Sequence, residues 1–157
     1  MKWPSVMSSF HLSGRHFTDR AIEVLNESGR QAAACGATSI TPEHVLLALA
    51  LVQRGPGRVA LERLGLDLHQ ERVTIADMLV RESSSGNQSS AALSSEVESL
   101  LSEAIEQSRG LGHSYVGTEH LTLALLSVSS GPAGDFLRER GISLENLRAE
   151  VLAVLSS

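Results

Sequence analysis

Apolar residues fall at helical spacing along much of the chain. Within residues 18–36 they repeat at the intervals that place side chains on one face of an α-helix, at Ala21, Val24, Leu25, Ala32 and Cys35. Residues 45–52 differ, because all eight are apolar and predict a central helix buried on every side. A strand is the alternative for so short a run, but its leucine and alanine content and the Thr41-Pro42 start favour a helix.

The same pattern occurs twice. Residues 41–44 (Thr-Pro-Glu-His) lead into one apolar stretch, and residues 117–120 (Gly-Thr-Glu-His) lead into another, 76 residues later. Aligning 17–80 with 93–156 without a gap gives 17 identities in 64 positions. The chain is therefore an internal duplication.

Each repeat is predicted to hold four helices. In the first repeat they span about 18–36, 41–52, 59–64 and 67–80. Thr18 and its equivalent Ser94 are suitable N-caps for the first helices, and Gly36 and Gly112 are suitable C-cap glycines. The pair Asp67 and Gln70 has the spacing of a capping box for the fourth helix, and Ser143 is the expected cap of its counterpart.

The predicted fold class is all-α, with eight helices in two four-helix repeats. Residues 17–81 form the first repeat and 93–157 the second, joined by a flexible Ser/Gly linker over 82–92. Residues 1–16 fit neither repeat and are expected to be a flexible N-terminal segment. Because a repeat of this length buries only a marginal core, the two repeats are expected to pack together as one domain.

Composition and charge exclude several classes of function. The net charge of −5, from 13 basic and 18 acidic residues, argues against a nucleic-acid partner. Lys2 is the sole lysine and does not lie in a phosphate-binding loop, and the single cysteine, Cys35, allows no internal disulfide or zinc cluster. The longest apolar run is too short to span a membrane, and the N-terminus does not resemble a signal peptide, so a cytoplasmic protein is expected.

Four stretches carry a resemblance to a known family. They are Phe-Thr-Asp-Arg-Ala at 17–21, Leu-Gly-Leu-Asp-Leu at 64–68, Leu-Gly-His-Ser-Tyr-Val-Gly-Thr-Glu-His-Leu at 111–121 and Gly-Ile-Ser-Leu at 141–144. With them, residues 17–155 resemble the Clp N-terminal repeat domain, the doubled helical module at the front of Clp/Hsp100 unfoldases. The ClpC type is the most similar.

The resemblance implies a fold of two pseudo-twofold repeats and a role that is not enzymatic. It implies a protein-binding module, without cofactors, that docks adaptor proteins and substrates and reads phosphoarginine. Arginine-phosphorylated substrates and Clp ATPase or peptidase subunits are further expected partners, and the protein is expected to be a monomer. The alternative is a stand-alone accessory Clp subunit or ligand sink, which binds the same partners without delivering them to an unfoldase.

Glu43 and Glu119 are the leading candidates for ligand binding. Each lies in the first turn of a buried helix, where an acid can simply complement the helix dipole. The functional alternative is that each carboxylate accepts a guanidinium in bidentate fashion, while phosphate reaches N–H groups at a helix N-terminus. The resemblance implies one phosphoarginine pocket per repeat, with the ligand-binding residues Glu119, Ser94, Thr118, Glu43 and Thr18. Pro42 departs from the family pattern and removes an N–H group from the first pocket.

The remaining candidates have structural explanations. His44 and His120 each follow a glutamate, and neither has the second histidine four residues on that a zinc-binding helix needs. Each is expected to pack at the start of its helix and to hydrogen-bond locally. Cys35 is expected to be a small core residue. No catalytic or metal-binding residue is predicted.

Overall fold

The computed structural model describes residues 16–52, 55–82, 92–128 and 131–156, which hold eight α-helices and four two-residue strands. In chain order these are β1 (His16–Phe17), α2 (Asp19–Ala34), β2 (Ser39–Ile40), α3 (Pro42–Leu51), α4 (Pro56–Arg63), α5 (Arg72–Glu82), β3 (Ala92–Leu93), α6 (Ser95–Gly110), β4 (Tyr115–Val116), α7 (Thr118–Val128), α8 (Pro132–Glu139) and α9 (Leu144–Ser156). Of the expected flexible segment over 1–16 and the expected linker over 82–92, residues 1–15 and 83–91 lie outside the described residues, whereas His16, Glu82 and Ala92 belong to β1, α5 and β3. The predicted all-α class with eight helices is confirmed.

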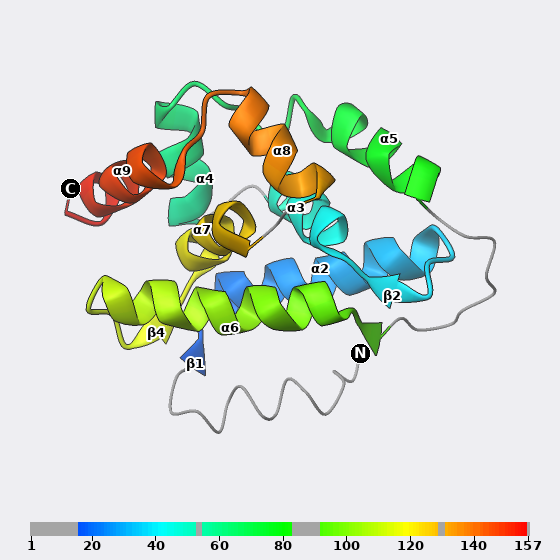
Figure 1. The fold of residues 1–157 in the computed structure, drawn as a ribbon, viewed down its shortest axis with the longest axis horizontal. Helices are drawn as coiled ribbons and strands as arrows, with labels where there is room; N and C mark the ends of the chain where they lie inside the picture. Colours follow the sequence, from blue (N-terminus) through cyan, green and yellow to red (C-terminus); the bar gives the residue numbers. More distant parts are fainter. Residues whose placement is uncertain (1–15, 53–54, 83–91, 129–130, 157) are drawn as a thin grey trace.

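The helices form three layers around a central pair (Figure 1). Helices α3 and α7 lie in the middle, with α2 and α6 on one side and α4, α5, α8 and α9 on the other. Residues 42–50 and 118–126 are buried without exception, as expected for central helices. None of the described helices combines the length and the apolar character needed to cross a membrane.

The predicted helix ends at Thr18, Ser94, Gly36 and Gly112 are confirmed. Thr18 Oγ1 accepts a hydrogen bond from the Ala21 N–H at 3.1 Å, and Ser94 Oγ accepts one from the Val97 N–H at 3.2 Å. Gly36 and Gly112 follow α2 and α6 with φ of 71° and 78°, the left-handed conformation that glycine adopts without strain.

The start of the fourth helix was predicted wrongly. Helix α5 begins at Arg72, because the Asp67 carboxylate accepts the His69 N–H at 3.0 Å and holds a turn there, and no capping box forms with Gln70. In the second repeat Ser143 caps α9 as expected, and its hydroxyl accepts the Asn146 N–H at 3.0 Å. The third helix begins at Pro56 rather than Val59, since proline suits the first helical position.

The short third helix of each repeat contacts the other repeat. Helix α4 of the first repeat packs on α7 and α9 of the second, and α8 of the second repeat contacts α3 of the first. At the start of α4 the Gly57 N–H donates to Thr118 Oγ1 at 3.2 Å, and at the start of α8 the Ala133 N–H donates to Glu43 Oε2 at 3.0 Å. The two repeats therefore share one core.

The four strands also pair across the repeats. Strand β1 pairs in parallel with β4, matching His16 with Tyr115, and β2 pairs in parallel with β3, matching Ser39 with Ala92. The sequence analysis did not predict these strands and placed His16 in the N-terminal segment. Each pair lies directly before the N-caps of two helices, so it sets which helix starts are neighbours.

The contact between α4 and α7 gives a test of the shared core. A Cβ at Gly57 would lie 2.8 Å from both the Thr118 carbonyl oxygen and Thr122 Oγ1. We expect Gly57→Ala to lower the free energy of unfolding by about 1–3 kcal/mol in urea denaturation, although alanine favours the helix itself.

Gly110→Ala is the matched control. It changes a helical glycine in α6 where the nearest atom to a new Cβ is Arg148 Nη2 at 3.8 Å. This substitution is expected to be neutral or to stabilise by up to about 1 kcal/mol. Equal effects of the two substitutions would contradict the packing seen between α4 and α7.

Candidate functional site

The strand pairs bring together candidate residues from different repeats. The Thr18 N–H donates to the Val116 carbonyl at 2.9 Å, so the start of α2 lies beside the start of α7. The Ser94 N–H donates to the Ile40 carbonyl at 3.0 Å, so the start of α6 lies beside the start of α3. The structure therefore places the Thr18 cap beside the helix start that holds Glu119, and the Ser94 cap beside the helix start that holds Glu43. These pairs lie across the repeats and not within each repeat as expected.

We call the two places the Glu119 site and the Glu43 site. The Glu119 site comprises Thr18, Tyr115, Gly117 and Glu119. The Glu43 site comprises Ser94, Thr41, Pro42 and Glu43. They occupy pseudo-equivalent positions, so differences between them reflect the local sequence.

Glu119 is a buried carboxylate for which the described residues supply no hydrogen bond of good geometry. Its side chain belongs to a residue that is 1% exposed, and neither Oε1 nor Oε2 makes a hydrogen bond of good geometry within the described residues. The carboxylate folds back over Gly117, where a Cβ would overlap with Oε1. A glycine at 117 is therefore required for this position of the carboxylate.

The surroundings of Glu119 disfavour the ionised form of its carboxyl group. Burial raises the pKa of Glu119, and its own backbone N–H, the Tyr115 hydroxyl and the charge of His113 offset the shift only in part. The pKa of Tyr115 is raised as well, first by burial and then by the nearby Glu119 carboxylate. A cation with two donors would restore the interactions that the carboxylate lacks.

Glu43 occupies a different position. Its Oε2 accepts the Ala133 N–H at the start of α8, and the residue is 5% exposed. Thr41 stands where the other site has Gly117, so a side chain lies in the space that the Glu119 carboxylate uses. The alternative that an acid here complements a helix dipole fits Glu43, although the helix is α8 of the other repeat as well as its own.

Thr118 is buried, and its hydroxyl group is already used. The residue is 1% exposed, and its hydroxyl accepts the Gly57 N–H. Thr18 and Ser94 are half-buried and cap their own helices. Of the five predicted ligand residues, the structure therefore brings Thr18 and Glu119 together and gives Thr118 and Glu43 contacts with the other repeat.

His44 and His120 are held as neutral rings, as expected for local packing. The Thr41 N–H donates to His44 Nδ1 and the Gly117 N–H donates to His120 Nδ1, both at 2.9 Å. Each ring thus accepts at Nδ1 and carries its proton at Nε2. His120 Nε2 lies 2.9 Å from His113 Nδ1, whereas His44 Nε2 lies 3.5 Å from Cys35 Sγ. Cys35 is half-buried and packs against the core.

An aromatic cluster beside Glu119 was missed by the sequence analysis. The rings of His113 and Tyr115 stack with centroids 5.1 Å apart, and His120 lies edge-on to His113 at 5.1 Å. His113 and Tyr115 are half-buried, so they form a partly exposed wall next to the carboxylate. Their place in the 111–121 stretch was the available signal. In the described ranges, no three His, Cys, Asp or Glu residues gather as metal ligands.

Comparison with known proteins identifies one family. A family model, the Clp repeat (R) N-terminal domain, matches residues 16–140 and 92–157. The chain is 33% identical over 143 residues to the negative regulator of genetic competence ClpC/MecB of Bacillus subtilis (strain 168), which covers 90% of this chain. The chain spans only 17% of the length of that relative.

Solved structures share the fold. The N-terminal domain of the Arabidopsis thaliana chaperone ClpD is 26% identical with a TM-score of 0.68, and the match covers 90% of this chain and 96% of that one. A ClpV N-domain in complex with a VipB peptide is 22% identical with a TM-score of 0.73, covering 99% of this chain and 92% of that one. At that identity the ClpV likeness supports the fold alone.

The two carboxylates are expected to respond oppositely to neutralisation. Glu119→Gln removes a buried charge that its neighbours stabilise only in part, and it should raise the free energy of unfolding at neutral pH by about 1 kcal/mol. Glu43→Gln replaces a charge-assisted cap of α8 by a neutral one and should lower it by about 1 kcal/mol. Urea denaturation of both variants measures the difference. A change of the same sign in both would show that the sites are equivalent after all.

The two buried histidines predict that the stability of the protein depends on pH. Burial lowers the pKa of His44 and of His120 to about 4, from about 6.5 in an unfolded chain. The unfolded state therefore binds more protons between these values, and stability should fall as pH drops from about 6.5 to about 4, by about 3 kcal/mol per histidine.

NMR titration of the imidazole resonances tests this directly. The His44 and His120 signals should stay at their neutral positions down to about pH 5. The Glu119→Gln background removes the opposing effect of the raised Glu119 pKa on the denaturation curves. Titration of either ring near pH 6.5 in the folded protein would contradict the neutral, buried assignment.

Proposed function

The chain belongs to the Clp repeat (R) N-terminal domain family, and from this membership we propose that it is a non-catalytic module that docks adaptors or substrates for a Clp unfoldase or protease. We further propose that it reads phosphoarginine at the Glu119 site. The relatives that it matches are much longer than this chain. The link to the activity of a complete unfoldase is therefore proposed and not observed.

The observation that carries the phosphoarginine proposal is the buried carboxylate of Glu119, which has no hydrogen bond of good geometry among the described residues. A guanidinium presents two parallel donors to a carboxylate, and such a pair is stronger where water is excluded. Tyr115 lies close enough to act on the pKa of Glu119 and is half-buried. In the proposed complex the guanidinium takes the place of the phenol beside the carboxylate and lies against the aromatic wall.

The N-terminus of α2 is the proposed phosphate-binding element. Thr18 caps this helix and lies next to Val116, three residues before Glu119. N–H groups in the first turn of a helix have no intrahelical acceptor, and the helix dipole favours an anion there. Asp19 lies on this turn as an exposed side chain, so main-chain N–H groups rather than net positive charge would hold the phosphate.

The chemistry at the site suits binding rather than reaction. The groups assembled there are a buried carboxylate, a phenol and imidazoles, one of which is fixed by a main-chain N–H group. A ClpV N-domain with the same fold is found in complex with a VipB peptide, and peptide capture is part of the proposed role. Proposed partners are adaptor proteins and substrates, including arginine-phosphorylated substrates.

Calorimetric titration with free phosphoarginine tests the proposal. We expect saturable binding to the wild type, with at least about tenfold loss in Glu119→Gln, because a neutral amide cannot pair with the guanidinium charge. Glu43→Gln should retain most of the affinity. Free arginine and phosphoserine are the ligand controls.

Two N-cap variants distinguish an effect on phosphate binding from an effect on the stability of the fold. Thr18→Ala and Ser94→Ala each remove an N-cap hydroxyl and should cost a similar free energy of unfolding, about 1 kcal/mol. Only Thr18→Ala should weaken the binding of phosphoarginine, because Ser94 lies at the other site. An absence of heat with the wild type, or equal losses in both cap variants, would overturn the assignment.

A further inference from the structure

The pseudo-symmetry of the fold is broken between α5 and α8. In the alignment of the repeats, α5 corresponds to α9 and α8 corresponds to α4. Helices α4 and α9 pack closely against each other, whereas α5 and α8 are not among the well-packed pairs of the described structure. A groove of about 340 Å³ lies between them instead, which we call the α5–α8 groove.

Bulky side chains hold the α5–α8 groove open. The position of Ala60 on α4, where α9 packs closely, is taken by Phe136 on α8. Arg140, in the place of Leu64, stacks over the Phe136 ring at 3.7 Å and pairs with Glu71 just before α5, with Nε 2.9 Å from Oε2. This stack fixes one end of α5 against the end of α8 and keeps the two helices apart.

The rim of the groove also lacks the pair that closes the equivalent place. Across α4 and α9, Arg63 pairs with Glu150 at 3.5 Å. The corresponding residues are Glu139 and Thr74, which cannot form an ion pair. Glu139 is exposed and has no ion-pair partner in the part of the chain that the structure describes.

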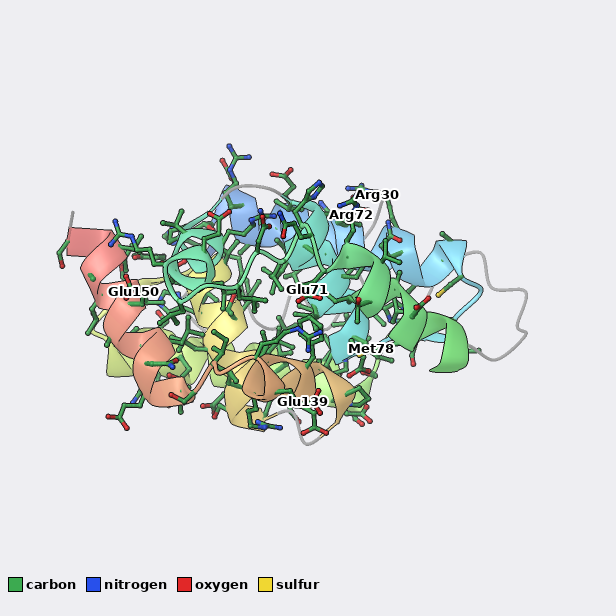
Figure 2. All side chains as sticks on the ribbon, turned by 90° about the horizontal axis from the view of Figure 1, so that it is seen from above. Arg30, Glu71, Arg72, Met78, Glu139 and Glu150 are labelled. Carbon is green, nitrogen blue, oxygen red and sulfur yellow. The ribbon has the colours of Figure 1, made fainter. Side chains whose placement is uncertain are left out.

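The groove combines an apolar floor with an acidic rim. Met78 from α5 and Pro132 and Phe136 from α8 supply the apolar surface, and Asp135 and Glu139 supply the carboxylates. Asp135 pairs with Arg138 at 3.1 Å, which leaves Glu139 as the rim carboxylate without an ion pair among the described residues. Figure 2 shows Met78 on the side of α5 that faces α8, with Glu139 on α8. The one cation in the lining, Arg140, is already balanced by Glu71. The floor suits an apolar side chain, and the rim suits a positive charge.

We propose that the α5–α8 groove docks peptide segments that carry an apolar side chain flanked by arginine or lysine. The apolar side chain lies between Met78 and Phe136, and the flanking cation faces Glu139. The groove and the Glu119 site share no residue, so this surface acts without phosphoarginine. It would hold a basic segment that is not phosphorylated, because a phosphate on the arginine would be repelled by the rim carboxylate.

A short fluorescein-labelled peptide in which leucines alternate with arginines is the probe. Fluorescence anisotropy with the full chain should show saturable binding, which weakens when glutamates replace the arginines or serines replace the leucines. Glu139→Arg should weaken binding by at least about threefold, because it reverses a rim charge. Glu106→Arg, the same charge change on an exposed position of α6, should leave the affinity within about twofold of the wild type.

A double variant tests the groove itself. Thr74→Glu with Glu139→Arg recreates the Arg63–Glu150 pair in the equivalent place and should reduce binding further than Glu139→Arg alone, by tying α5 to α8. Glu119→Gln should leave the probe affinity unchanged. The proposal fails if Glu139→Arg and Glu106→Arg behave alike, if Glu119→Gln abolishes probe binding, or if the groove proves to be filled by a second copy in sedimentation experiments.

Discussion

Two hydrogen bonds between the repeats determine much of what the rest of the structure can do. The short helices α4 and α8 each bury their N-terminus against the other repeat, where water cannot satisfy their first N–H groups. A buried N–H group without an acceptor costs about 1–3 kcal/mol, so each helix start requires an acceptor from its neighbour. Thr118 meets the requirement for α4 and Glu43 meets it for α8.

The Glu119 site and the Glu43 site differ because α4 and α8 use different acceptors. Thr118 has a hydroxyl, and the equivalent residue, Pro42, does not. The first repeat therefore supplies the next residue, Glu43, to α8, whereas Glu119 is not needed for α4. Gly117 gives the released carboxylate a place to fold back, and Thr41 fills that space at the other site. Because Thr118 caps α4, the neighbouring Glu119 carboxylate is left without a hydrogen bond of good geometry among the described residues.

Features decided within one helical turn were predictable from the sequence. Thr18, Ser94 and Ser143 act as caps because a side chain and an N–H group three residues apart meet whatever the surroundings are. Asp67 was misassigned because its side chain has an equally local alternative, the turn at His69. The grouping of Thr18 with Glu119 could not be predicted in this way. It depends on strand pairs of only two residues, which carry too little pattern to detect.

The exchange of elements between the repeats also bears on how such a chain could arise. A single repeat contains half of each site and completes neither, since the hydroxyl and the carboxylate of a site come from different repeats. Before duplication, an ancestral repeat would have needed a homodimer to form them, with both sites identical by symmetry. Gene fusion removes that constraint, because the two copies of one codon can then change independently. The difference between Thr41 and Gly117 is of a kind that a homodimer of identical repeats cannot hold.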